Sequence, residues 1–579
     1  MAGSDAFAQH AAHSFSTSAK NRDAAFEQLA DRYFEQVYFT FAPTQGTLDG
    51  FHQYDTQLED YSRAGLDREI AALIGFEKEF AAVPPESLSL TCQGDRELVL
   101  GNIRSTLLSL QTIRPWERNP DTYSSGITES AFSLMERTFA SPDDRLRSLI
   151  ARERQMPAAL ADARRNLKNP PHIFTEIALE QLPGLIAFFQ SDVPNAFVNA
   201  HDPRLQAEFA ATNAGVIAAL QSYRSWLESD LLPRSHGDFR LGTETYRKKL
   251  LYDEMVDTPL PKLLGIAYAD LHKNQAEFQR VAQQVDPGKQ ARQVLQELQQ
   301  DHPAPAQLLQ SFRDTFSGLI QFIQSRRLVD IPSNVRPIVE ETPPFMRATT
   351  IASMDTPGPY EKNATEAYFN VTLPGPHDTP EEIAGRMAEF NRGTIISTSV
   401  HEAYPGHYIQ FLWVQQAPTK VRKLLGAASN SEGWAHYCEQ MMLDEGYGQP
   451  GTGARDARDA KMIHLGQLQD ALLRDARFVV GIRMHTGTMT FEQAIDFFVQ
   501  EGYQSRESAL IEAKRGASDP TYLYYTLGKL QILKLRADLQ KKEGANFSLE
   551  RFHDDFLKQG YPPVKIVRRA LLGNDSPTL

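Results

Sequence analysis

Apolar residues recur at steps of three and four along most of this chain of 579 residues, and this spacing constrains its fold more than any other feature. Such spacing places the apolar side chains on one face of an α-helix. It predicts helices over residues 23–42, 67–83, 143–167, 202–232 and 259–285. Segments rich in proline and glycine, which end helices, separate them. We therefore expect a mainly α-helical protein.

One region departs from the helical pattern. Between residues 336 and 375, short runs of β-branched and aromatic residues alternate with turn residues, which is typical of strands. The runs are FMRATTIAS (345–353) and TEAYFNVTL (365–373). We therefore expect one small β-sheet, followed by further helices to the end of the chain.

Charge and hydropathy exclude two classes of partner. The formal net charge of −13 argues against a general nucleic-acid-binding role, because such proteins need basic surfaces to displace counterions. No stretch approaches the length of about 18 apolar residues that indicates a transmembrane helix, so we expect no membrane span. The sequence does not indicate an oligomeric state.

The cysteines and the N-terminal segment give evidence about the cellular compartment in which the protein works. Cys92 and Cys438 are far apart in the sequence, so we expect no disulfide framework. Residues 1–23 have neither the basic region nor the apolar run of a signal peptide, and we expect none there. We expect a soluble protein, either cytoplasmic or, with a signal already removed, periplasmic or secreted.

The stretch HEAYPGH, residues 401–407, is similar to the H-E-x-x-H helix of metalloproteases but has two additional residues. In an uninterrupted helix, residues six apart diverge by about 120°, so the two imidazoles would point apart. Pro405 cannot donate to the carbonyl of His401 and crowds it, and Gly406 lets the backbone adapt. We therefore expect a bulge or kink that turns His407 back toward His401, so that both bind one metal ion.

A hydrolytic zinc site needs about three protein ligands and an open position for water. The segment NSEGWAHYCEQMM, residues 430–442, offers Glu432 as the leading third ligand and His436 as an alternative ligand. Glu439 follows Glu432 on the same helix face and is expected to orient one of the two histidines. A core hydrogen-bonding role is the alternative for Glu432.

Glu402 has a different expected role from its neighbour His401. We expect it to act as the general base, which takes the proton from the metal-bound water and passes it to the leaving amine. The site would hold one Zn²⁺ ion.

These motifs resemble the bacterial DUF885 family, whose members look like zinc-dependent gluzincin-type peptidases, distantly similar to carboxypeptidase Taq and the angiotensin-converting-enzyme group. The resemblance implies a multi-helical gluzincin-like architecture, metal ligands at His401, His407 and Glu432, and Glu402 as the base. It spans nearly the whole chain, and its segments are HEAYPGH, SEGWAHYCEQ (431–440), RDARFVVGIRMH (474–485), YYTLGKLQILKLRADL (524–539), ETPPFMR (341–347), EAYFNVTLP (366–374), TETYRKKLL (243–251) and TLDGFHQYD (47–55).

Amide hydrolysis builds a negatively charged oxygen, which a hydrogen-bond donor opposite the base would stabilise. We expect Tyr525 to be this donor, with His485 as the second choice. Relatives often carry proline, glycine and glutamine before their tyrosine, and this chain departs from that pattern, so Tyr522 and Tyr524 remain competing candidates. The alternatives are packing for the tyrosines and a capping or core role for His485.

The substrate-binding residues are predicted from strand and charge patterns. The strand EAYFNVTL, residues 366–373, is predicted to form a sheet edge that holds an extended peptide, with Tyr368 and Asn370 facing the cleft. An ordinary covered strand is the alternative. Charged candidates for binding a free C-terminal carboxylate are Arg347, Arg477, Arg483 and Lys529, and simple solvation is the alternative for each.

Together these features predict a zinc hydrolase of peptide or peptide-like amide bonds, with a carboxypeptidase-like preference. An N-terminal helical lobe (1–235) and a catalytic lobe (236–579) would form one continuous unit around a deep cleft. The catalytic lobe would contain the sheet and the metal-binding helices, at about 394–446. The alternatives are a metal-dependent hydrolase of another amide or ester, and a metal-stabilised binding protein without turnover.

Overall fold

The computed structural model describes residues 21–343, 346–347, 350–375 and 378–579. Most of the segment for which we expected no signal peptide therefore lies outside the described residues, as does part of the predicted strand run 345–353. No helix in the described ranges has both the length and the apolar character needed to cross a membrane. The structure is mainly helical, as the sequence predicted.

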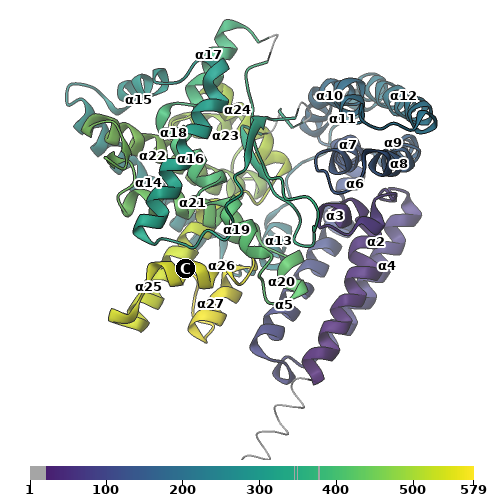
Figure 1. Cartoon of the computed structure of the whole chain (residues 1–579), viewed down its shortest axis with the longest axis horizontal. Coiled ribbons are helices and arrows are strands. Elements are labelled where there is room, and N and C mark those ends of the chain that lie inside the picture. The colour runs from purple at the N-terminus through teal and green to yellow at the C-terminus, as the bar shows by residue number, and fades with distance from the viewer. Residues whose placement is uncertain (1–20, 344–345, 348–349, 376–377) are drawn as a thin grey trace, which may run out of the picture.

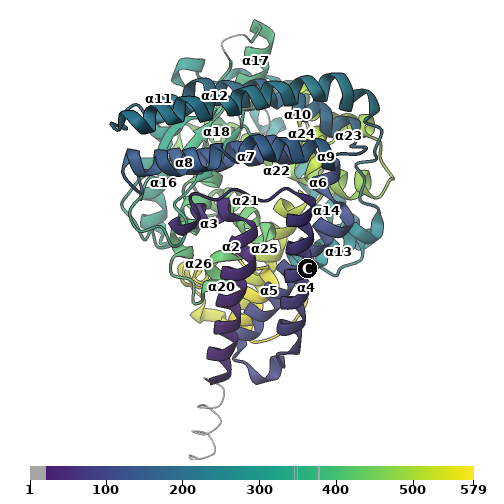
Figure 2. The same cartoon turned by 90° about the vertical axis from the view of Figure 1, so that its right-hand side faces the viewer.

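The N-terminal helices gather on the right-hand side of Figure 1, where the upright α4 and α5 stand below a group of helices viewed end-on. Figure 2 shows that this group, which includes α7, α8 and α12, runs crosswise above them. After a helical segment at 21–33, the elements are α2 (Phe39–Phe41), α3 (Pro43–Leu48), α4 (Arg63–Ala82), α5 (Leu90–Leu108), α6 (Pro115–Arg118), α7 (Asp121–Met135), α8 (Pro142–Glu153), α9 (Met156–Asn166), α10 (His172–Ala187), α11 (Val193–Ala196) and α12 (Pro203–Trp226).

The helices predicted from apolar spacing are confirmed, with one division. The segment predicted as a single helix over 143–167 forms α8 and α9, which meet near Gln155. Pro157 lies in the first turn of α9, where its missing N–H costs nothing. A proline at that position cannot continue the preceding helix, and this explains the break.

The remaining elements form the left-hand side of Figure 1, and the three-stranded sheet lies between them and the N-terminal helices. They are α13 (Thr243–Glu254), α14 (Leu260–Val285), α15 (Ala291–Gln300), α16 (Leu308–Arg326), β1 (Ile338–Glu341), β2 (Ala352–Asp355), β3 (Tyr368–Val371), α17 (Pro380–Glu389), α18 (Arg392–Glu402), α19 (His407–Val414), α20 (Lys420–Leu424), α21 (Ala428–Asp444), β4 (Gln449–Pro450), β5 (Gly453–Ala454), α22 (Ala457–His485), α23 (Phe491–Gln500), α24 (Arg506–Ser518), α25 (Tyr524–Glu543), α26 (Leu549–Leu557) and α27 (Val564–Leu572).

The small sheet is present between residues 336 and 375, but its edge is not where the sequence placed it. The strand order is β1-β3-β2, with β3 parallel to β1 and antiparallel to β2. Tyr368 and Asn370 therefore lie on the central strand, and Asn370 is buried. The prediction of an edge strand there was wrong, because Ile338–Glu341 forms an additional strand that pairs with it. The edge next to the cavity residues described below is β2.

Two pairs of glycines let the central helices approach closely. A side chain on Gly393 of α18 would come within 2.8 Å of the Met462 carbonyl oxygen and 2.9 Å of the Gly466 Cα of α22. A side chain on Gly433 of α21 would come within 2.5 Å of the Gly528 Cα of α25. These contacts fix α18 and α21 against α22 and α25 at backbone distance, where a larger residue would force them apart.

We predict that Gly528→Ala destabilises the protein by about 1–3 kcal/mol, because the added methyl group would clash with the carbonyl oxygen of Ser429 on α21. Chemical denaturation measures the free energy of unfolding. Gly215→Ala is the matched control. It lies on exposed α12 with no atom within 4 Å of the added carbon, and it should stabilise by up to about 1 kcal/mol. Equal stability of the Gly528→Ala and unsubstituted proteins would contradict the prediction.

Candidate metal centre

The helix that carries His401 ends at Glu402, and a new helix begins at His407. The sequence predicted a bulge or kink here, and the structure shows a full interruption over four residues, with a cis peptide bond before Pro405. The Gly406 N–H donates to the Val400 carbonyl at 2.9 Å. A side chain on Gly406 would clash with the His401 carbonyl oxygen, so the turn requires glycine.

The interruption is tied to α21, which carries Glu432. The indole N–H of the fully buried Trp434 donates to the Pro405 carbonyl oxygen at 3.0 Å. Trp434 lies two residues after Glu432, so this bond fixes the acidic side chain relative to both histidines.

Three side chains converge at this point. Glu432 Oε2 lies 3.3 Å from His401 Nε2 and 3.3 Å from His407 Nε2. The two imidazole rings are nearly perpendicular, at 89°, with their centroids 4.9 Å apart. Both histidines are buried. The structure thus brings together the three residues that the sequence singled out as ligands.

The spacing of these atoms fits a single transition-metal ion. Bonds of about 2.0–2.1 Å in a tetrahedral arrangement place neighbouring ligand atoms about 3.4 Å apart. The two distances of 3.3 Å match such edges, and the three ligand atoms lie within 4.8 Å of one another. Two imidazoles and one carboxylate form a donor set that leaves a fourth position open.

Glu439 holds His401 in the orientation that metal binding requires. His401 Nδ1 donates to Glu439 Oε1 at 2.7 Å, and this leaves the Nε2 lone pair facing His407 and Glu432. The other oxygen of Glu439 lies 3.0 Å from Nδ1 of His436. His436 therefore supports the site through Glu439, and the structure does not bring it into the group of ligand atoms.

In this buried cluster, the negative charge of Glu439 is offset by Arg474 and by the neighbouring histidines. Burial would raise the pKa of Glu439, but the Arg474 guanidinium, at 3.4 Å, and two histidines hold it well below its ordinary value. Burial lowers the pKa of His401, but its bonds to Glu432 and Glu439 outweigh this and raise the pKa to about 9. A metal ion would compete with this proton, and its affinity should fall as the pH falls.

Tyr525 is the tyrosine that lies beside the convergent group. Its ring centroid is 6.2 Å from that of His401, and its hydroxyl accepts a hydrogen bond from Arg515 at 2.9 Å. Burial raises the pKa of Tyr525, so the phenol keeps its proton and remains a donor. Tyr524 instead donates to Asp519, and Tyr522 is buried in an apolar cluster.

His485, the second candidate for stabilising the oxyanion, lies in a different environment. It is the last residue of α22, and its Nε2 donates to the Gly516 carbonyl oxygen at 2.7 Å. Its ring packs near Phe239 and Tyr246. Burial lowers its pKa to about 4. These contacts correspond to the core role that was the alternative for His485, because its polar nitrogen is already used to satisfy a backbone carbonyl.

The four cations proposed to bind a substrate carboxylate already have partners within the protein. Arg347 pairs with Glu341 at 2.7 Å, and Lys529 with Asp270 at 2.8 Å. Arg477 forms two bonds of 2.7 Å with Glu512, and Arg483 donates to the Tyr268 hydroxyl at 3.1 Å. The predicted role does not fit Arg347, Arg477 and Lys529, because each would have to give up a carboxylate partner. The contacts of Arg483 leave its predicted role untested. Tyr368 likewise donates to the Glu136 carbonyl oxygen at 3.2 Å.

Sequence reasoning missed two arginines near the site. Arg474 lies against Glu439, and Arg515 bonds Tyr525. Arg474 precedes Arg477 by three residues, so helical spacing could have indicated that both face the same side of α22. No pattern in the sequence distinguishes Arg515 from other arginines on exposed helices.

The sequence matches the family described as "Bacterial protein of unknown function (DUF885)" over residues 43–571. A solved structure described as "a putative lipoprotein of unknown function" from Shewanella oneidensis is 26% identical, with a TM-score of 0.76, and the match covers 94% of this chain and 99% of that chain. A second, "the putative lipoprotein from Colwellia psychrerythraea", is 17% identical, with a TM-score of 0.77 and coverage of 96% and 99%. That second likeness shows the fold alone. No curated protein matches the sequence.

We predict that His401→Ala, His407→Ala and Glu432→Ala each reduce the bound metal of the purified protein to a small fraction, because each removes one of three ligands. Elemental analysis after dialysis measures the metal content. His172→Ala, which removes an exposed histidine on α10, is the control and should leave the content unchanged. Full metal content in the three ligand variants would exclude this site.

We predict that Glu439→Gln weakens metal affinity by about 10–100-fold without abolishing binding, because it removes the charge that orients His401. Competition with a chromogenic chelator measures the affinity. Asp444→Asn, on the same helix but outside this network, should leave it unchanged. An affinity equal to that of the unsubstituted protein would show that His401 is held by other contacts.

Proposed function

The chain belongs to the DUF885 family, and from its site we propose that it is a zinc-dependent hydrolase that cleaves peptide bonds. The observation that carries this proposal is the convergence of His401, His407 and Glu432, in a tetrahedral spacing, directly beside Glu402. We further propose a gluzincin-like arrangement, in which the N-terminal helices and the remaining helices form two lobes around a cleft.

A zinc ion bound by these residues would polarise the scissile carbonyl and lower the pKa of a bound water. Glu402 is the last residue of α18 and is buried next to His401. Its carboxylate accepts the proton of the attacking water and delivers it to the leaving amine. Glu402 is close enough to His401 for its charge to contribute to raising the pKa of that imidazole.

Tyr525 stabilises the oxyanion. Arg515 donates to its hydroxyl oxygen, so the hydroxyl proton remains available for the substrate. The positive charge of Arg515 also polarises the phenol, which strengthens its hydrogen bond to a developing negative charge. The raised pKa of Tyr525 keeps this proton in place at neutral pH.

We predict that Glu402→Gln lowers kcat by about 100-fold or more while the metal content stays unchanged, because the amide cannot accept the proton. Mass spectrometry of a defined peptide mixture measures cleavage, and elemental analysis measures the metal. Glu381→Gln, an exposed change on α17, is the matched control and should cleave like the unsubstituted protein.

Two results would contradict this mechanism in different ways. Cleavage by Glu402→Gln at the unsubstituted rate would exclude Glu402 as the base. Absence of cleavage by the zinc-loaded, unsubstituted protein across peptides, other amides and esters would instead indicate a metal-stabilised binding protein. Cleavage confined to non-peptide amides or esters would preserve the metal chemistry and change the substrate class.

A further inference from the structure

A cavity of about 910 Å³ lies between the two groups of helices. Its walls come from α7 and α10 on the N-terminal side, from strand β2, and from α24. The volume is at the upper end of the range of about 300–1,000 Å³ for small-molecule sites. It is therefore large enough for a short peptide.

One residue that lines the cavity also contacts a side chain beside the candidate metal centre. Arg515 lines it and donates to Tyr525, whose ring lies beside that of His401. In addition, β2 packs next to α18 and α19, the two helices that carry the histidines. His401, His407 and Glu432 do not line the cavity themselves, so Arg515 and Tyr525 are the residues that connect a ligand there to the metal centre.

Arg515 differs from the other cations of this region because, among the described residues, no carboxylate pairs with it. Arg477 is bound to Glu512, and Lys514 is paired with Glu180 at 2.5 Å. Arg515 has its hydrogen bond to Tyr525, a neutral phenol. The charges of Glu512 and Asp519 act on Arg515 and raise its pKa, but neither carboxylate is in ion-pair contact with it. A half-buried guanidinium with no carboxylate in contact is suited to bind a ligand carboxylate.

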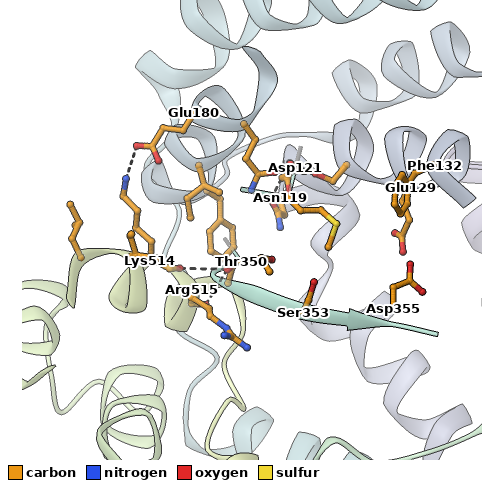
Figure 3. A pocket seen from close by; sticks show the side chains of 18 of the residues that line it. Asn119, Asp121, Glu129, Phe132, Glu180, Thr350, Ser353, Asp355, Lys514 and Arg515 are labelled. Atoms are coloured by element: carbon orange, nitrogen blue, oxygen red, sulfur yellow. Dashed lines mark hydrogen bonds and ion pairs between the residues drawn. The ribbon is translucent and has the colours of Figure 1, made fainter. Parts of the chain in front are cut away.

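The opposite side of the cavity is acidic. Figure 3 shows Glu129 and Asp355 pointing toward each other there, while Lys514 and Arg515 lie on the other side. Asp355 is already paired with Arg137, so Glu129 is the carboxylate that a ligand cation would meet. Burial, together with nearby carboxylates that include Asp355, raises the pKa of Glu129, so the carboxylate is in an environment that a cation would relieve. Glu382 also lines the cavity, but it is exposed and water screens its charge.

Between these two sides runs the edge strand β2. It pairs with β3 through one side only, so its other side offers backbone groups to an extended ligand. Ser353 of this strand lines the cavity, and its hydroxyl oxygen is buried without a hydrogen-bond partner among the described residues. A ligand hydrogen bond would satisfy it.

We propose that the substrate is a short peptide with free ends, which lies along β2 with its C-terminal carboxylate on Arg515 and its N-terminal ammonium on Glu129. The inference rests on the proposed function, because it names the substrate of that site. It places the C-terminal end of the peptide nearest the metal centre, through the contact of Arg515 with Tyr525. The hydrolysis would therefore act on bonds close to the C-terminus.

The test measures binding to the zinc-loaded Glu402→Gln protein, which does not consume the peptide. Calorimetry would compare one oligopeptide in three forms: with free ends, with an amidated C-terminus, and with an acetylated N-terminus. We expect amidation to weaken binding by about 10–100-fold. Adding Arg515→Gln should abolish this difference, because the free-acid peptide then loses its partner. A general effect of the substitution on Tyr525 or on folding would weaken both forms equally.

Arg506→Gln on the same helix is the matched control, since its exposed side chain lies on surface carboxylates, and the ratio between free and amidated peptide should persist. Acetylation should weaken binding by about tenfold, and Glu129→Gln should remove that difference. Equal affinity for free and amidated peptides would overturn the assignment of Arg515. Dependence on a glutamate side chain in the peptide, with no effect of amidation, would overturn it as well and indicate an acidic side chain as the ligand.

The same peptides given to the unsubstituted enzyme separate this inference from the proposed function. Cleavage of free-ended and amidated peptides at the same rate would remove the inference and leave the hydrolase. Selective binding of the free-ended peptide without cleavage by the unsubstituted protein would remove the hydrolase and leave a peptide-binding site.

Discussion

The interruption between α18 and α19 is the constraint on which the site depends. A continuous helix would point His401 and His407 in directions about 120° apart, and no single ion could contact both. Only glycine fits at position 406, because its backbone lies against the carbonyl groups of the preceding helix. Trp434 then bonds the interruption to α21 and so brings Glu432 to the same point. The acidic ligand and the two imidazoles are thus positioned by one local irregularity.

The buried charge of Glu439 is surrounded by groups that stabilise it. Glu439 receives hydrogen bonds from two histidines and the charge of Arg474, which offset the cost of burying a carboxylate. Glycine contacts hold the helices that carry these groups at backbone distance. Close packing and charge balance together keep His401 in the tautomer that presents Nε2 to Glu432 and His407.

Sequence reasoning predicted what depends on local spacing. The helices followed from apolar periodicity, and the convergence of His401, His407 and Glu432 followed from helix geometry and the Pro405–Gly406 pair. It failed where long-range pairing decides the outcome. Tyr368 lies on a central strand because a segment before it, Ile338–Glu341, adds a further strand. The partners of Arg477 and Lys529 lie on other helices, and only the folded chain brings them together.

The metal ligands and one wall of the cavity come from different parts of the fold. The three converging side chains all belong to α18, α19 and α21, which pack into one core with α25. The cavity takes one wall from this half and the opposing wall from α7 and α10. A hinge movement of the N-terminal helices would therefore widen or narrow the entrance while the coordination geometry stays intact.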